Sequence, residues 1–133
     1  MKDAADYLAH IKSLIILNPQ VEHWQILREA IEDNMGLFRY RLALRDDSFF
    51  EAFERFQVVD GETRVSKYSF HWQSADGQLR KRWDNASHHP EVSTHPHHLH
   101  KGTEDNIVSH KSITVEEALA IVTAEVKIGK IGR

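Results

Sequence analysis

Turn-forming residues recur at regular intervals through the middle of the chain, and they limit the possible folds more than any other feature of the sequence. The signals fall at residues 33–36, 46–48, 59–62 and 74–77, and the last two contain the Asp-Gly pair that favours tight hairpins. In the segment after the first turn, Phe38, Tyr40 and Leu42 alternate with Arg39 and Arg41. The strands expected from this pattern cover 37–44, 49–58, 63–73 and 78–84. We therefore expect a meander of antiparallel strands.

Helices are expected at both ends of this meander. Residues 4–17 follow Asp3, which can cap a helix, and residues 115–127 follow a capping box made by Thr114 and Glu117. Residues 21–31 fit either a helical stripe or a strand, and we favour the strand because the next turn would then close a hairpin.

The expected fold is α+β, with about five meandering antiparallel strands packed by the N- and C-terminal helices. Residues 107–109 are a candidate for one more short strand. At 133 residues, the chain is expected to form a single domain over 1–133.

Composition argues against several functional classes. The formal net charge is −3 and there is no cysteine, which argues against nucleic-acid binding by bulk charge and excludes disulfides and thiolate metal sites. No apolar run approaches the ~20 residues that a membrane-spanning helix needs. Asp3 and Asp6 stand where a secretory leader would carry positive charge. We therefore expect a cytoplasmic protein with no membrane partner.

Histidines are concentrated in residues 82–100, which hold six of the ten in the chain. Pro90 and Pro96 indicate a loop from 85 to 101, because proline disrupts helices and central strands. A loop of this length in a small domain is usually functional or disordered. We predict that its imidazoles meet the guanidinium groups of the preceding strand in one pocket.

Acid–base chemistry on RNA is the first use that such a pocket could have. Cleavage at a 2′-hydroxyl needs one group that accepts a proton and one that donates a proton, and the ordinary pKa of imidazole suits both roles. Cations around the phosphorus stabilise the developing charge. The predicted catalytic residues are Glu54, Arg82, Asp84, Asn85, His88, His97, His98 and His100. The predicted substrate-binding residues are Arg80, Lys81, Trp83 and His89.

The predicted roles differ within this set. Arg82 would hold an anion and Asp84 would orient that guanidinium, while Asn85 would position the loop. Glu54 lies in an otherwise apolar row of its strand. It is therefore either a structural partner for an arginine or a backbone group, or a carboxylate that lines a cleft.

A metal site is the second possible use of the pocket. One residue separates His98 from His100, which places both rings on one side of an extended segment. With His88 or Asp84 they would form a three-ligand site for zinc, nickel or manganese, and the predicted ligands are His88, His98 and His100. No other cofactor is expected. The third use is a surface that binds a partner protein, and the sequence leaves all three open while RNA chemistry is favoured.

The histidine stretch also resembles a known family. Residues 82–89, Arg-Trp-Asp-Asn-Ala-Ser-His-His, and residues 96–100, Pro-His-His-Leu-His, are similar to the paired motif of the TumE family of small prokaryotic toxins. The chain departs from the family pattern at Ser87, where proline is usual, and at His95, where an aromatic residue is common. The resemblance covers most of the chain, including Glu54.

This resemblance implies the toxin of a toxin–antitoxin pair, with growth inhibition as its effect and a cognate antitoxin protein as its partner. It does not imply a particular biochemical target. RNA and a second copy of the chain, which would make a homodimer, are the other candidate partners.

Overall fold

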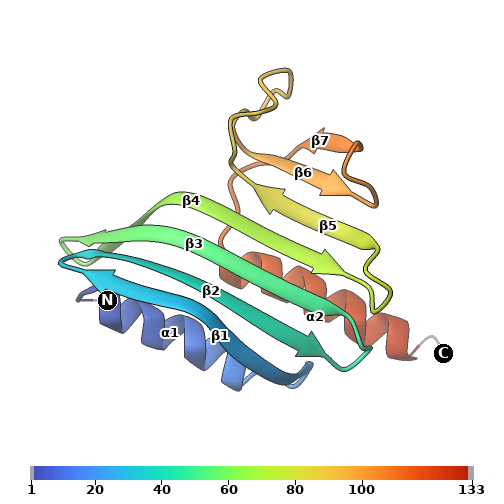
Figure 1. Ribbon diagram of the computed structural model, residues 1–133, viewed down its shortest axis with the longest axis horizontal. Helices are drawn as coiled ribbons and strands as arrows, with labels where there is room; N and C mark the ends of the chain where they lie inside the picture. The colour runs from blue at the N-terminus through green and yellow to red at the C-terminus, as the bar shows by residue number, and fades with distance from the viewer. Residues whose placement is uncertain (1, 132–133) are drawn as a thin grey trace.

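The structure is a computed structural model that describes the backbone of residues 2–131 and the side chains of residues 2–127 (Figure 1). The elements in chain order are α1 (Ala4–Ile16), β1 (Val21–Glu32), β2 (Met35–Leu44), β3 (Phe49–Val59), β4 (Glu62–Gln73), β5 (Leu79–Asp84), β6 (His98–Lys101), β7 (Ile107–Ser109) and α2 (Val115–Ile131). The strands form one seven-stranded sheet in the order in which they occur in the chain. Every neighbouring pair is antiparallel, so the predicted α+β meander is confirmed, with more strands than the five expected.

Both helices lie on the same side of the sheet, which we call the helix-covered face (Figure 1). The buried side chains of β2 occupy every second position, as the alternating pattern predicts. They pack with the apolar stripe of α1, which includes Tyr7, Leu8 and Ile11, and with the buried side of α2, which includes Ala118 and Val122. The core therefore lies between the sheet and the two helices, and the opposite, helix-free face of the long strands is left for polar groups.

The ambiguous segment at 21–31 is a strand, as favoured. β1 pairs with β2 along almost its full length, and a turn at residues 33–34, within the predicted 33–36, closes the hairpin. β1 is nevertheless mostly exposed, because it is the edge of the sheet. Its apolar residues could not distinguish a strand from a helix, because they alternate imperfectly and few of them are buried.

Two boundaries differ from the sequence prediction. The predicted loop over 85–101 contains strand β6, which lies inside the sheet between β5 and β7. Pro96 does not prevent this, because β6 begins two residues later at His98 and all of its backbone amides are free to pair. The helix α2 continues to Ile131 rather than ending near residue 127.

The helix starts agree with the predicted caps. Asp3 accepts a hydrogen bond from the backbone amide of Asp6 at 2.9 Å. Thr114 and Glu117 form the reciprocal pair of a capping box, in which each side chain accepts from the backbone amide of the other residue. Within residues 2–131, no helix is both long enough and apolar enough to cross a membrane.

Candidate functional site

The site lies on the helix-free face, where the strand register aligns polar side chains from β2 to β6. One row across the sheet consists of the facing residues Arg41, Glu51, His71, Arg82 and His100. The neighbouring row consists of Arg39, Phe53, Ser69, Asp84 and His98. Because side chains alternate between faces along a strand, residues two apart share a face, and antiparallel pairing then sets Asp84 opposite His98 and Arg82 opposite His100.

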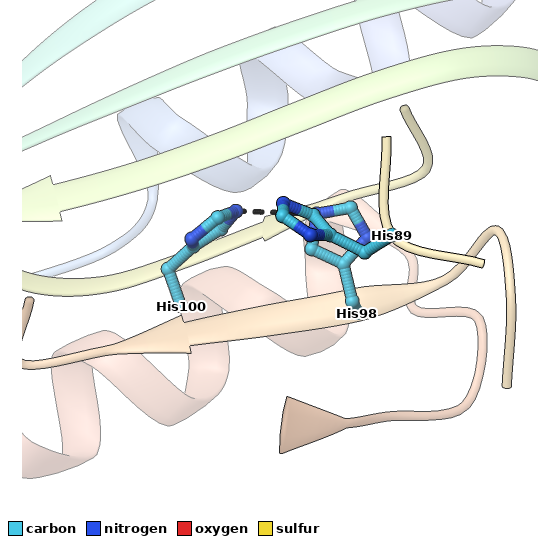
Figure 2. Close-up of side chains that lie close together, drawn as sticks. All are labelled: His89, His98 and His100. Atoms are coloured by element: carbon cyan, nitrogen blue, oxygen red, sulfur yellow. Dashed lines mark hydrogen bonds between the residues drawn. The ribbon is translucent and has the colours of Figure 1, made fainter. Parts of the chain in front are cut away.

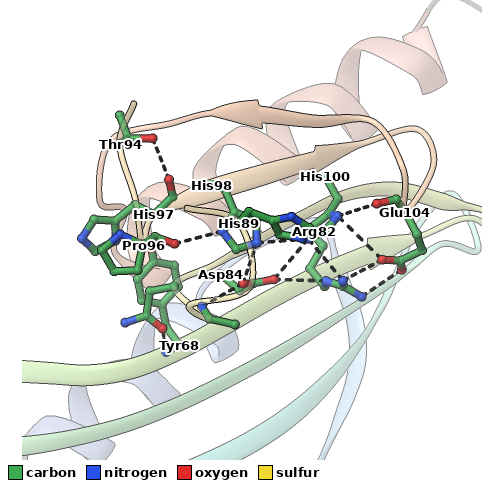
Figure 3. A network of polar contacts seen from close by, with 12 residues as sticks. Tyr68, Arg82, Asp84, His89, Thr94, Pro96, His97, His98, His100 and Glu104 are labelled. Atoms are coloured by element: carbon green, nitrogen blue, oxygen red, sulfur yellow. Dashed lines mark hydrogen bonds and ion pairs between the residues drawn. The ribbon is translucent and has the colours of Figure 1, made fainter. Parts of the chain in front are cut away.

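Asp84 is the acceptor at the centre of the site (Figure 3). Its Oδ1 lies 2.9 Å from Nε2 of His98 and accepts a hydrogen bond from the backbone amide of Ala86 at 3.0 Å. Its Oδ2 lies 3.3 Å from Nε of Arg82 and 3.5 Å from Nε2 of His100. With a side chain only 10% exposed, Asp84 depends on these partners to compensate for its lost hydration.

The orientations of His98 and His100 are fixed from behind by backbone carbonyls. Nδ1 of His98 donates to the carbonyl oxygen of Pro96 at 2.9 Å, and Nδ1 of His100 donates to that of Glu104 at 2.9 Å. A carbonyl oxygen can only accept, so each Nδ1 carries the proton and each Nε2 faces the site. The two Nε2 atoms are 3.1 Å apart, and the dashed line in Figure 2 marks this contact.

His89 completes a group of three imidazoles (Figure 2). Its ring lies 5.0 Å from that of His98 and 5.7 Å from that of His100, measured between centroids. One ring nitrogen from each histidine falls within a span of 4.8 Å, close enough to hold a metal ion. The structure therefore brings His89, rather than the predicted ligand His88, to His98 and His100. His88 is exposed.

Arg82 is held by two carboxylates. Besides Asp84, its guanidinium pairs with Glu104, with Nη1 2.8 Å from Oε1 and Nη2 2.6 Å from Oε2 (Figure 3). Glu104 was not among the predicted site residues. Its only signal in the sequence is a carboxylate four residues after His100, in the turn that follows the His-x-His pair.

Asn85, predicted to position the loop, ties the end of β5 to β4. Its Oδ1 accepts from the backbone amide of Tyr68 at 3.0 Å, and its Nδ2 donates to the backbone carbonyl of Ser66 at 3.1 Å. The amide side chain thus replaces backbone pairing at the point where the chain leaves the sheet after Asp84. The start of the histidine loop is fixed as a result.

His97 is separate from the three imidazoles. Its Nδ1 lies 2.8 Å from the hydroxyl of Tyr68, and the two rings stack with centroids 5.8 Å apart. Burial raises the pKa of Tyr68 to about 12, with a smaller contribution in the same direction from Asp84, while a backbone hydrogen bond from Ile113 opposes the shift. Tyr68 therefore remains a neutral hydroxyl that holds His97.

Two adjoining depressions mark the surface of the site. The first, the histidine hollow, has a volume of about 260 Å³ and is lined mainly by Lys67, Tyr68, Ser69, Arg82, Asp84, His88, His89, His98 and His100. The second, the arginine groove, has a volume of about 420 Å³ and is lined by Arg39, Arg41, Phe49, Glu51, Ser69, His71, Gln73 and Arg82. Because Ser69 and Arg82 line both, the two depressions adjoin each other.

Three of the predicted substrate-binding residues lie outside the site. Arg80 pairs with Asp46 at 2.9 Å and its guanidinium lies over the ring of Trp72, because a bulge shifts the pairing of β4 with β5. Lys81 pairs with Glu125 of α2 at 2.8 Å. Trp83 is fully buried in the core.

Glu54 also lies outside the site, on the helix-covered face. It is 1% exposed and accepts a hydrogen bond from the hydroxyl of Tyr7 in α1. Burial raises the pKa of Glu54 to about 7, and the hydrogen bond from Tyr7 partly opposes this. Its partner is a tyrosine hydroxyl rather than the arginine or backbone group considered above, because the strand faces a helix at this position.

The fold and the site define an α+β protein with a histidine centre on the helix-free face of its sheet. The family model described as toxin TumE matches residues 11–128. The chain therefore belongs to the TumE family, as its paired histidine motif indicates. Membership supports a toxin role and implies an antitoxin partner. No curated protein and no solved structure matches the chain.

Proposed function

We propose that this toxin acts on RNA in the cytoplasm, and that it binds and cleaves the phosphodiester backbone along the arginine groove and the histidine hollow. The observation that carries the proposal is that the two depressions adjoin each other, which sets cations on β2 and β4 beside a cluster of imidazoles. Such a surface offers both backbone binding and proton transfer. The net charge of −3 is no obstacle, because the local field is what steers an anion.

The cations that would bind phosphate are those not already paired. Arg82 is held by Asp84 and Glu104, so its role is to organise the site rather than to bind an anion alone. Among the described residues, Arg41 and Lys67 make no ion pair. Arg41 lies over the ring of Phe49 in the arginine groove, and Lys67 lines the histidine hollow. These two side chains are the best candidates for phosphate contacts.

Cleavage would need no redox partner. A proton carrier takes the 2′-hydroxyl proton, the 2′ oxygen bonds to phosphorus, and the bond from phosphorus to the 5′ oxygen breaks as that oxygen receives a proton. His88 is the one exposed imidazole among the four that line the histidine hollow. His97, His98 and His100 would act as the other proton carriers or as ligands. Asp84 and Asn85 would hold the arrangement in place.

Binding and cleavage can be tested separately. We expect Arg41→Ala and Lys67→Ala each to weaken binding of single-stranded RNA and to lower its salt dependence by about one ion. Arg64→Ala is the matched control, since Arg64 is an exposed arginine of β4 that lines neither depression. Equal losses in all three variants would indicate bulk charge instead of a site.

Cleavage is tested by inducing the wild-type chain and His88→Ala in cells and comparing growth with RNA integrity. We expect the wild type to arrest growth and fragment RNA, and the variant to do both less. Growth arrest with intact RNA, combined with uncut RNA in vitro under every metal condition, would refute the proposal. It would favour the alternative, a histidine-rich metal-binding or protein-interaction module without catalysis.

A further inference from the structure

Three imidazoles of the histidine hollow are held in the same way. Nδ1 of His98 and of His100 donate to backbone carbonyls, and Nδ1 of His89 lies 3.0 Å from the carboxylate of Glu91. An oxygen acceptor on Nδ1 of each ring leaves Nε2 as the nitrogen of each ring that can accept, and in His100 this atom already lies 3.3 Å from Nη2 of Arg82. Metal-bound histidines in proteins almost always have such a partner on the second nitrogen, which fixes the ring and raises its basicity.

Apart from Nη2 of Arg82, which is a donor 3.3 Å from Nε2 of His100, the atoms that face one another inside the cluster are electron donors. Nε2 of His98 lies 3.1 Å from Nε2 of His100 and 2.9 Å from a carboxylate oxygen of Asp84. With Nδ1 already protonated, neutral rings would direct lone pairs at one another and at a negative charge. The arrangement therefore requires a cation at Nε2 of His98.

A bound metal fits this position better than a single added proton. A proton on His98 would satisfy one ring, but it would give no reason for His89 to be oriented towards the same point. In a tetrahedral zinc site with Zn–N distances of about 2.0–2.1 Å, two ligand nitrogens are about 3.3 Å apart. The 3.1 Å between His98 and His100 is close to this value, and the third nitrogen lies within the 4.8 Å span of the group.

The surrounding charge also favours a cation. Arg82 brings one positive charge, with Nη2 3.3 Å from Nε2 of His100. Asp84 and Glu104 both pair with Arg82 and bring two negative charges. Lys67 of the same hollow balances one of these charges, and Glu91 behind His89 adds a third carboxylate, so with neutral imidazoles the surroundings are net negative by one charge.

We propose that His89, His98 and His100 bind one divalent transition metal ion, most favourably Zn²⁺, through their Nε2 atoms, with Asp84 as the nearest further oxygen ligand. Three histidines and a carboxylate are ligands that suit zinc, and the absence of cysteine makes a softer thiolate site impossible. The proposal does not depend on the RNA role, because it concerns what the cluster binds and not what it cleaves.

The adjacent pair His88 and His89 supplies the test. Untagged protein is stripped with a chelator and titrated with Zn²⁺ alone by calorimetry. We expect one ion per chain for the wild type and for His88→Ala. His89→Ala should bind more weakly by at least about tenfold, since even outer partners of a zinc site contribute 10–100-fold to affinity. Both residues lie in the loop between β5 and β6, so neither alanine is expected to unfold the chain.

A second measurement identifies the ligand atoms without any substitution. Long-range ¹H–¹⁵N spectra of the imidazoles should show all three histidines with protonated Nδ1, and Zn²⁺ should shift their Nε2 signals.

His98→Ala and His100→Ala, checked for folding by circular dichroism, should lose binding as His89→Ala does.

Failure of the wild type to bind Zn²⁺ stoichiometrically would overturn the proposal, as would equal losses in His88→Ala and His89→Ala. Zinc binding by a protein that leaves RNA intact would remove the proposed function and keep the metal site. RNA cleavage by a protein that binds no zinc would support the proposed function and refute the metal site.

Discussion

Two buried carboxylates on opposite faces of the same sheet show how position decides chemistry. Glu54 lies on the helix-covered face, where its hydrogen-bond partner is the neutral hydroxyl of Tyr7. Asp84 lies on the helix-free face, where it contacts Arg82, His98 and His100. Both are nearly inaccessible to water: as whole residues, Glu54 is 1% exposed and Asp84 is 7% exposed.

The difference between them is the charge that each environment can support. Tyr7 offers one hydrogen bond and no positive charge, so burial dominates and raises the pKa of Glu54 to about 7. Asp84 has a guanidinium and two imidazole rings within reach, so the ionised carboxylate can organise a polar network. On the helix-covered face, Glu54 therefore stabilises the fold best when it is protonated. On the helix-free face, the negative charge of Asp84 attracts the positive charge of Arg82.

The largest expected effect comes from neutralising Asp84. Asp84→Asn keeps the shape but removes the buried carboxylate that Arg82 and His98 share and leaves Arg82 only the exposed Glu104, so we expect a loss of about 3–5 kcal/mol in the free energy of unfolding at pH 7. Urea denaturation measures it, with exposed Asp105→Asn as the control. A loss below about 1 kcal/mol would mean that the network adds no more than a surface ion pair does.

Glu54→Gln should make the folded chain more stable than the wild type, and only at higher pH. Because the folded chain holds the Glu54 proton up to a pKa of about 7, stability from this group is complete below the ordinary pKa of about 4.5 and is lost as the pH rises to 7. We expect the wild type to lose about 3 kcal/mol relative to Glu54→Gln across this window. Denaturation of both proteins at several pH values measures the difference, and a constant difference would contradict the assignment.

Removing the hydroxyl of Tyr7 tests the environment of Glu54 further, with a smaller expected change in the free energy of unfolding. Tyr7→Phe leaves ionised Glu54 buried without a donor, which should cost about 1–3 kcal/mol at pH 8. Since the hydrogen bond from Tyr7 lowers the pKa of Glu54, its loss should also extend the pH-dependent window upward. The double variant Tyr7→Phe with Glu54→Gln should lose that pH dependence, and its persistence would point to another group.

The smallest expected effect on stability is that of Glu104→Gln. The side chain of Glu104 is 54% exposed, so the loss of its pairing with Arg82 should change the free energy of unfolding by less than about 1 kcal/mol. It should nevertheless release Arg82, and we expect tighter binding of single-stranded RNA in a fluorescence titration. Unchanged or weaker binding would show that Arg82 does not face the bound anion.

Much of the fold could be predicted because its signals are local. The Asp-Gly turns and the alternation around Tyr40 depend only on neighbouring residues, and they predicted the order of the central hairpins and the buried face of β2. The short strand β6 was missed, since four residues that include two histidines carry little hydrophobic signal. Only pairing with β5 on one side and β7 on the other identifies it.

The site divides in the same way. The sequence by itself determined that Arg82 and Asp84 lie on the same side of their strand and that His98 and His100 lie on the same side of theirs, because the period of a strand is two residues. Only the tertiary structure decided that these faces meet, that His89 rather than His88 joins them, and that Glu104 holds Arg82. The reason is physical: the strand period is a property of the local backbone, whereas the path of a loop and the choice of a partner for a buried charge depend on groups brought together from distant parts of the chain.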